Sequence, residues 1–286
     1  MLSLVLVAKT VLAFDVSAYT SPAMTTLDRH VPGSFCWMEL ATSDQNSAKH
    51  YYANLFGWQA ADTPMGPDAM YTIFRLDNRD SAACYTLHKG QRDAGVPPHW
   101  MIYVAVENVD AMAQKAGSLG GQVMVPPFDV MDLGRMAVIT DPTGAFISMW
   151  QSKQHSGIGV RDEEGAFCWA DLNTPDPEKA SKFYSSLFGW EMMKDPKDTS
   201  GYIHIKNGEN FQGGIPAEIP PGVPAHWLPY FQTSNCDASA RSAQELGGKV
   251  CFGPMSLEGV GRFAAVLDPQ GAAFAIFQSA RMAASQ

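Results

Sequence analysis

The sequence is poor in positive charge. Its 286 residues include 20 lysines and arginines against 29 aspartates and glutamates, which gives a formal net charge of −9 at pH 7. No stretch of the chain is a basic run, and proteins that bind nucleic acids or anionic membrane surfaces need basic patches. We therefore expect neither a nucleic acid nor a membrane surface as a partner.

Cysteine is scarce as well. The five cysteines include no Cys-x-x-Cys pair, and an odd number without regular spacing is typical of reduced thiols in a cytoplasmic protein. A structural zinc site is therefore not expected. No glycine-rich phosphate loop and no serine-centred nucleophile elbow is present. These absences exclude the usual signatures of nucleotide-binding proteins and serine hydrolases.

The chain has no apolar run of membrane-spanning length. The apolar stretch at residues 1–14 (MLSLVLVAKTVLAF) is too short for a bilayer. Lys9 lies inside it rather than ahead of it, so the positive start of a secretory signal is missing. We expect a cytoplasmic protein whose working initiator is Met24. Residues 16–18 (VSA) offer a small-residue cleavage site, so export through a weak N-terminal signal is the alternative.

What the chain does contain is a duplication. Residues 35–58 (FCWMELATSDQNSAKHYYANLFGW) return as residues 167–190 (FCWADLNTPDPEKASKFYSSLFGW), and residues 134–146 return as 261–273. A repeat of this length indicates two similar domains rather than a solenoid. Each candidate site residue can therefore be compared with its counterpart in the other copy.

The repeat divides the chain into five parts. An N-terminal extension (1–32) precedes the first domain (33–151), a polar linker (152–164) leads to the second domain (165–278), and a short tail (279–286) follows. The length of the chain agrees with two domains that each bury a core. We expect the domains to pack against each other within one chain, and a homodimer is left open.

Each copy predicts two β-α-β-β-β units. A short strand of alternating residues (35–41; 167–173) precedes a helix that begins after an aspartate and ends at a glycine, and short strands follow. A second unit begins with the strands at 100–106 and 227–233. Two such units pair into a curved mixed sheet, so the predicted fold is α+β, with two tandem domains that each contain a concave cleft. A concave cleft is the default site for a small-molecule ligand.

The combination of an aspartate-capped helix, LFGW and a later GR…DPxGA segment resembles the vicinal oxygen chelate superfamily. This superfamily includes glyoxalase I, bleomycin-resistance proteins and extradiol dioxygenases. The resemblance covers residues 33–278 in both copies, and the paired PHW and AHW blocks resemble a two-domain branch labelled glyoxalase-like or hydroxylase. It implies the fold and leaves the activity open, because one fold supports many functions.

The resemblance also implies where a divalent metal would bind. Its usual ligands are one residue on the first strand of each unit and one on the last strand of the domain. In the first copy these three positions hold Trp37, Met101 and Ser148. In the second copy they hold Trp169, Leu228 and Ala275. Indole, thioether and alkyl groups are not ligands that a hard divalent cation selects. We therefore predict neither a metal nor another cofactor.

Strand alternation places a carboxylate beside each tryptophan. Glu39 shares a face with Trp37, and Asp171 shares a face with Trp169. Burial beside an indole favours the acid form of a carboxylate, which suits general acid–base catalysis. A structural role, in which the carboxylate accepts hydrogen bonds from a neighbouring strand, is the alternative.

The same alternation sorts the neighbours of these tryptophans. It predicts Phe35 and Phe167 on the cleft face. It predicts Cys36 and Cys168 on the opposite face, where they pack against helices as inert thiols.

Histidine and tyrosine recur on the strand that opens the second unit. His99 shares a face with Tyr103, and His226 shares a face with Tyr230. They are candidates for orienting a polar ligand or transferring a proton. Each histidine also follows a proline closely, at a strand entrance where a hydrogen bond to the loop is common.

One arginine in each copy follows the glycine of the GR pair. The guanidinium groups of Arg135 and Arg262 are candidates to bind a carboxylate or phosphate of a substrate. Pairing with a protein carboxylate, such as Glu39 or Asp171, is the other interpretation.

Three functions follow from these patterns. The leading one is a metal-free protein that binds a small organic molecule in its clefts, for sequestration, resistance or sensing. Its expected ligand contacts are Trp37, Trp169, Tyr103, Tyr230, Arg135, Arg262 and Ser148. The second is a lyase, isomerase or hydroxylase-like enzyme with Glu39 or Asp171 and His99 or His226 as acid and base. The third is an exported protein that acts through protein contacts.

Overall fold

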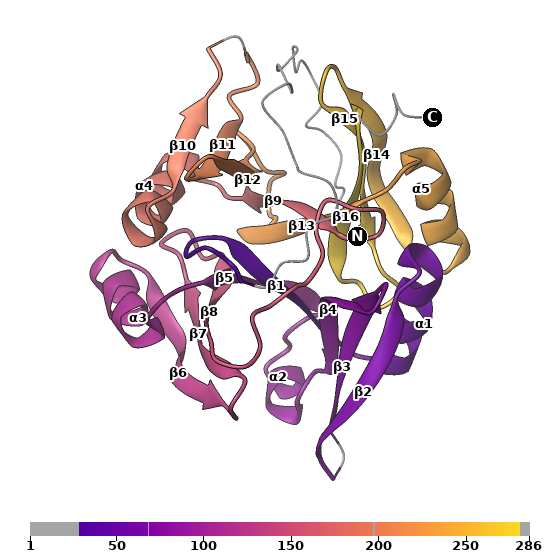
Figure 1. The fold of residues 1–286 in the computed structure, drawn as a ribbon. Helices are drawn as coiled ribbons and strands as arrows, with labels where there is room; N and C mark the ends of the chain where they lie inside the picture. The colour runs from indigo at the N-terminus through magenta and orange to yellow at the C-terminus, as the bar shows by residue number, and fades with distance from the viewer. Residues whose placement is uncertain (1–28, 68, 197, 281–286) are drawn as a thin grey trace.

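The computed structural model describes residues 29–280 except for positions 68 and 197 (Figure 1). The predictions about the N-terminal apolar stretch, the cleavage site and the initiator lie outside these residues, as does most of the expected tail. None of the helices in the described part is long and apolar enough to cross a membrane.

The first half of the chain builds one eight-stranded mixed sheet with helices beside it. In chain order its elements are β1 (Phe35–Thr42), α1 (Gln45–Phe56), β2 (Gln59–Gly66), β3 (Ala69–Leu76), β4 (Arg79–Thr86), α2 (Lys89–Asp93), β5 (His99–Ala105), α3 (Val109–Ser118), β6 (Gln122–Val130), β7 (Gly134–Thr140) and β8 (Phe146–Ser152). In space the strands are ordered β2-β3-β4-β1-β5-β8-β7-β6. The two units of the sheet therefore meet where β1 pairs antiparallel with β5.

The second half repeats this arrangement. Its elements are β9 (Phe167–Asn173), α4 (Pro177–Phe188), β10 (Glu191–Lys194), β11 (Ile203–Asn207), β12 (Asn210–Ile215), β13 (His226–Gln232), α5 (Cys236–Glu245), β14 (Lys249–Leu257), β15 (Gly261–Leu267) and β16 (Ala273–Ser279). The strand order β10-β11-β12-β9-β13-β16-β15-β14 is equivalent to that of the first sheet. The predicted α+β fold of two tandem domains is confirmed.

Three elements were not located in the sequence. The edge strand β2 is exposed at almost every residue, so it lacks the alternation of apolar and polar residues that reveals a half-buried strand. The edge strand β10 has only four residues, and the short helix α2 has only five, none of them buried. Elements without a buried face leave little trace in a hydrophobic pattern.

The helices that follow the first strand of each copy begin and end as predicted. The carboxylate of Asp44 accepts a hydrogen bond from the Ser47 amide, and that of Asp176 accepts one from the Lys179 amide, each at 3.0 Å. Such caps bind amide groups that a helix start leaves unpaired. The helices end at Gly57 and Gly189, whose φ angles of +72° and +78° are ones that glycine adopts without strain.

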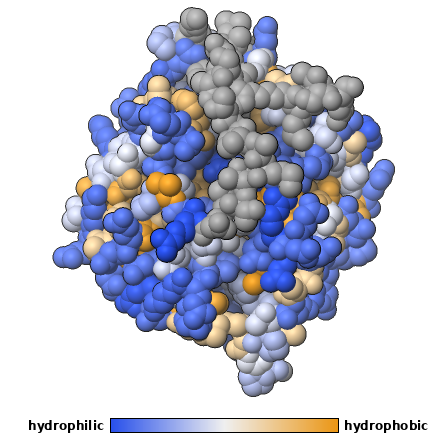
Figure 2. Space-filling view, viewed as in Figure 1, coloured by the Kyte–Doolittle hydropathy of each residue, from blue (hydrophilic) through white to orange (hydrophobic). Residues whose placement is uncertain are grey.

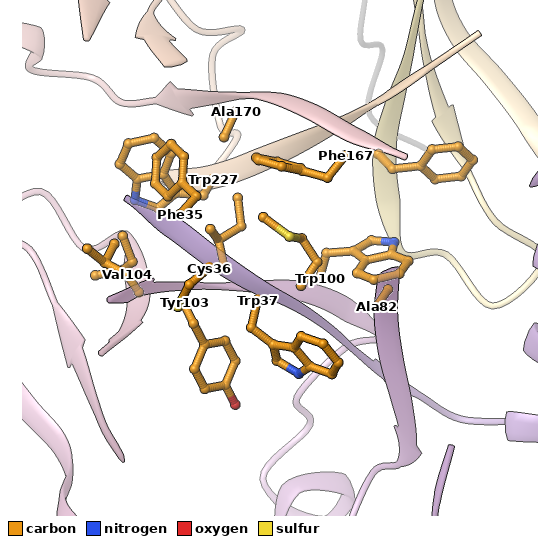
Figure 3. Close-up of a cluster of buried hydrophobic side chains, with 14 of the residues drawn as sticks. Phe35, Cys36, Trp37, Ala82, Trp100, Tyr103, Val104, Phe167, Ala170 and Trp227 are labelled. Carbon is orange, nitrogen blue, oxygen red and sulfur yellow. The ribbon is translucent and has the colours of Figure 1, made fainter. Parts of the chain in front are cut away.

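The two sheets share one hydrophobic core between them. The ring of Phe35 lies 6.1 Å from that of Phe167 and 5.3 Å from that of Trp227, both in the other half of the chain (Figure 3). It also lies 5.4 Å from the ring of Trp190 in that half. Helix α1 lies beside α5, and α3 beside α4 (Figure 1). The two domains therefore pack against each other within one chain.

A β-bulge in the first strand of each domain changes which side chains face the core. Phe35 pairs with Val104 and Trp37 with Tyr103, so Cys36 is an extra residue in β1. The same shift occurs in β9. The extra residue reverses the alternation. The prediction that Phe35 and Phe167 face the clefts was wrong, because both lie in the core between the sheets.

The bulge also moves one of the two matched cysteines. Cys168 packs with Tyr230 and Ala275, in a cluster separate from the main core, and it belongs to the lining of the hollow described below. The prediction that Cys168 packs against the helices, away from the cleft, was therefore wrong. Cys36 is fully buried in the main core, and burial raises the pKa of both thiols.

Candidate functional site

A large hollow is lined by strands of both sheets. Its volume is about 3700 Å³, several times the roughly 300–1000 Å³ of a typical small-molecule pocket, so it comprises more than one site. We call cleft 1 the part lined by Glu39, Met101 and Tyr103 of the first sheet. Cleft 2 is the part lined by Asp171 and Tyr230 of the second sheet.

In cleft 1 the carboxylate of Glu39 is held by two tyrosines. The Tyr71 hydroxyl donates to Glu39 Oε2 and the Tyr103 hydroxyl to Oε1, each at 2.7 Å. The indole N–H of Trp37 donates to the Tyr71 oxygen at 3.1 Å. Strands β1, β3 and β5 each contribute to this network, so its geometry depends on the whole centre of the sheet.

Cleft 2 contains an equivalent network around Asp171. The Tyr202 hydroxyl donates to Oδ1 and the Tyr230 hydroxyl to Oδ2, each at 2.6 Å. The indole N–H of Trp169 lies 2.9 Å from the Tyr202 oxygen and 3.1 Å from Asp171 Oδ1. The duplication has therefore kept a complete set of groups, a tryptophan, a carboxylate and two tyrosines.

The two networks are adjusted to carboxylates of different length. Glu39 lies opposite Ala83 on the neighbouring strand, whereas Asp171 lies opposite Gly214. A methyl group on Gly214 would overlap the Tyr202 hydroxyl. The missing side chain lets Tyr202 approach the strand and reach the shorter aspartate.

Burial raises the pKa of both carboxylates. The pKa of Asp171 rises to about 6, although hydrogen bonds from Tyr202, Tyr230 and Trp169 favour the charged form. The pKa of Glu39 is also raised by burial, against the opposing effect of hydrogen bonds from Tyr71 and Tyr103. A carboxyl group of this kind exchanges its proton closer to neutral pH than an exposed one does.

Tyr71 and Tyr202 were not identified from the sequence. The two tyrosines are counterparts in the duplication, in the segments MYTIF and GYIHI. Comparing these two segments could have identified them as a repeated pair. Their distance to the carboxylates depends on how β3 and β11 pair within each sheet, which the repeat alone does not give.

The predicted histidines line the hollow, but each is bound to a loop. Nδ1 of His99 lies 2.8 Å from the Pro97 carbonyl oxygen, and Nδ1 of His226 lies 2.9 Å from the Pro224 carbonyl oxygen. Burial lowers the pKa of His226. Among the described contacts of these rings, none is a hydrogen bond to Glu39 or Asp171.

The predicted arginines point elsewhere. Arg135 forms a two-pronged ion pair with Asp110 on α3, at 2.7 and 2.8 Å, and Arg262 forms the same pair with Asp237 on α5, at 2.8 Å for both contacts. Pairing with a protein carboxylate is correct, but the expected partners Glu39 and Asp171 were wrong. Neither guanidinium is part of the described lining of the hollow.

Ser148 lies on the floor of cleft 1, opposite Tyr103 on the neighbouring strand. Its hydroxyl is buried and has no hydrogen-bond partner among the described residues. The counterpart in cleft 2 is Ala275, opposite Tyr230. At this position the two clefts therefore differ by one hydroxyl group.

Comparison with known proteins identifies the family. A model described as the Glyoxalase/Bleomycin resistance protein/Dioxygenase superfamily matches residues 34–149. The chain is also 39% identical over 246 residues to "Putative glyoxylase CFP32" of Mycobacterium tuberculosis. The aligned residues cover 85% of this chain and 94% of that protein. The chain belongs to the glyoxalase/bleomycin resistance protein/dioxygenase superfamily. The resemblance expected from the sequence is confirmed.

Two further proteins match this chain over most of its length. "Anthracycline biosynthesis protein DauV" of Streptomyces sp. (strain C5) is 32% identical over 266 residues, which cover 88% of this chain and 95% of that protein. The crystal structure of the 2,3-dioxygenase LapB from Pseudomonas sp. KL28 aligns with a TM-score of 0.59, covering 90% of this chain and 94% of LapB. At 14% identity this likeness concerns the fold alone.

The side chains of this superfamily member do not fit the metal that the resemblance implies. The Trp37 and Trp169 indoles, at positions where the resemblance implies ligands, donate hydrogen bonds to tyrosine hydroxyls. Both oxygens of Glu39 and of Asp171 accept hydrogen bonds from tyrosine. In the described part of the chain, no three histidine, cysteine, aspartate or glutamate side chains come together as metal ligands.

Proposed function

We propose that this superfamily member binds a small organic molecule in its clefts and works without the divalent metal. The observation that carries the proposal is the duplicated network of a tryptophan, a carboxylate and two tyrosines, in which the tryptophans stand where the resemblance implies metal ligands. Networks of this kind fix the orientation of a few polar groups, which is what a mainly apolar ligand site needs for specificity.

The relatives support a small organic ligand. One carries a glyoxylase name and the other an anthracycline biosynthesis name, and the acidic charge of this chain gives no support to a nucleic acid as the alternative. Sequestration, resistance and sensing all require only that the ligand is held. The ligand contacts that we propose are the tyrosines and the carboxylates of the two networks and the Trp169 indole. Trp37 was also expected to contact the ligand, but it is buried and is not part of the described lining of the hollow.

Metal analysis tests this function. We expect purified protein to contain far less than one metal ion per cleft. Added nickel, zinc or iron should not produce turnover of a methylglyoxal–thiol adduct. Stoichiometric metal that supports this turnover would contradict the proposal.

A second candidate is an enzyme that uses a cleft carboxylate as general acid or base. The observation that favours it is the pKa of Asp171 at about 6, because a catalytic acid works best when its pKa lies near the operating pH. The reaction would be of the lyase, isomerase or hydroxylase-like type. If Glu39→Gln and Asp171→Asn leave a discovered turnover unchanged, this candidate fails.

A further inference from the structure

The two clefts differ in how much apolar surface they expose. Six apolar side chains that line cleft 1 are 38–48% exposed: Met65, Met70, Met124, Val125, Phe128 and Phe146. We call these six the rim of cleft 1. In the described part of cleft 2 the corresponding β14 side chains Cys251, Phe252 and Met255 are only partly exposed. The face of the molecule shown in Figure 2 is mostly hydrophilic, with apolar residues scattered over it.

Exposed apolar groups gathered around a cleft indicate a binding site. Three of the six rim residues are methionines, whose flexible and polarisable side chains adapt to flat ring surfaces. The rim of cleft 1 is therefore suited to a planar apolar body, and cleft 2 has no equivalent rim among its described residues.

Around Glu39 the floor of cleft 1 accepts hydrogen bonds rather than donating them, while the neighbouring Ser148 hydroxyl can do either. The hydroxyl groups of Tyr71 and Tyr103 both donate their hydrogens to Glu39. Toward a ligand these hydroxyls can therefore only accept hydrogen bonds. Glu39 is partly exposed and receives two hydrogen bonds, although two carboxylate oxygens accept about four. A ligand at this floor therefore meets free acceptor positions.

Asp171 in cleft 2 has fewer accessible hydrogen-bond acceptor positions than Glu39. It is 7% exposed, and its oxygens receive hydrogen bonds from Tyr202, Tyr230 and Trp169. A ligand would find one acceptor position fewer and less access to it.

We propose that cleft 1 is the principal ligand site and that it selects a neutral or cationic aromatic molecule whose hydroxyl or amino group donates to Glu39. This inference rests on the proposed binding function and narrows it to one cleft and one ligand class. An anionic ligand is disfavoured because like charges repel when both are partly desolvated. The two arginines best placed by sequence to offset such a charge are paired with Asp110 and Asp237.

A small molecule fits this cleft better than a protein segment does. The acceptor group lies at the bottom of a concave, apolar-rimmed cavity, which is the usual design of small-molecule sites. A second copy of the chain, bound through the exposed rim, is the competing occupant.

Three matched probes test the selectivity by isothermal titration of the full chain. They are 2-naphthol, which carries a donor, 2-methoxynaphthalene, which lacks it, and 2-naphthoate, which is an anion. We expect 2-naphthol to bind at least tenfold more tightly than 2-methoxynaphthalene, and 2-naphthoate to bind most weakly. Equal binding of all three would leave the proposed function standing and overturn this inference. Binding of none would overturn both.

Variants identify the cleft. Glu39→Gln should reduce the preference for 2-naphthol over 2-methoxynaphthalene to less than threefold, because the amide turns a donor toward the ligand. This ratio does not change merely because part of the protein is unfolded. If Asp171→Asn removes the preference and Glu39→Gln does not, cleft 2 is the site and the inference is wrong.

The rim is tested with a matched pair of exposed apolar residues. Phe128→Ser should weaken the binding of 2-naphthol severalfold. Met193→Ser, at a residue that is 42% exposed outside the hollow, should leave it unchanged. If the chain is a dimer that Phe128→Ser converts to a monomer, the rim belongs to a second copy and the inference is overturned.

Discussion

At the scale of single residues, tyrosines hold two carboxylates inside an apolar sheet. A carboxylate that is removed from water loses hydration, and hydrogen bonds from Tyr202 and Tyr230 offset only part of that loss. The pKa of Asp171 therefore rises to about 6 despite these donors. Such a group couples the stability of the fold to pH.

Replacing Asp171 should reveal this coupling. Because the folded-state pKa is raised, the folded protein binds the proton more tightly than the unfolded chain. The contribution of Asp171 to stability is then largest below pH 4 and falls between about pH 4 and pH 6. A shift from 3.8 to about 6 corresponds to about 3 kcal/mol. The free energy of unfolding of the native protein, relative to Asp171→Asn, should fall by about this amount from pH 4 to pH 7 in urea titrations. A constant difference would show that the carboxyl group is not desolvated.

The pairing of Asp171 with Gly214 predicts a compensating substitution. Gly214→Ala should push Tyr202 away from Asp171 and destabilise the fold by about 1–3 kcal/mol, because a buried group loses its partner. Adding Asp171→Glu recreates the combination of Glu39 and Ala83 and should recover at least half of this loss. Asp171→Glu alone serves as the control. Additive effects in the double-mutant cycle would contradict the explanation.

At the scale of secondary-structure elements, the sequence revealed those with a buried face and a capped end. The helices after β1 and β9 followed from Asp44, Asp176 and their terminal glycines. The bulges did not follow, because the alternation of side chains carries no sign of an extra residue. Because each bulge adds one residue to its strand, Phe35 and Phe167 lie in the shared core and Cys168 faces cleft 2.

The candidate site could be predicted only where its members lie close together along the chain or on paired strands. Trp37 and Glu39 are separated by one residue, and the pattern of β5 supplied Tyr103. Tyr71 comes from β3, two strands away from β1 in the sheet, so its hydroxyl could be placed only with the sheet assembled. The same holds for the ion pair of Arg135 with Asp110, since it depends on where α3 lies.

At the scale of the whole molecule, the two domains behave as one body because their cores are continuous. Trp58 donates its indole N–H to the Gly165 carbonyl at 2.9 Å, and Trp190 donates to the Gly33 carbonyl at 2.7 Å. The Tyr52 hydroxyl also reaches Asp268 Oδ2 at 3.0 Å. Each domain thus completes the interior of the other.

This continuity predicts a single unfolding transition. Phe35→Ala, in the core between the sheets, should destabilise both domains together by about 3–5 kcal/mol. Calorimetry should show one transition at a lower temperature. Phe146→Ala, at a side chain that is 47% exposed, should shift stability by less than about 0.5 kcal/mol. Two separate transitions in the Phe35 variant would mean that the domains are independent.

The central claim is that the cleft carboxylate network, rather than a metal ion, holds the ligand. The most direct measurement is the dissociation constant of 2-naphthol for protein dialysed against EDTA, with and without added nickel, zinc or iron. We expect the same dissociation constant within about twofold in every case, because no metal takes part in binding. A tenfold change would correspond to about 1.4 kcal/mol of binding energy. Binding that disappears in EDTA and returns with one equivalent of metal would contradict the central claim.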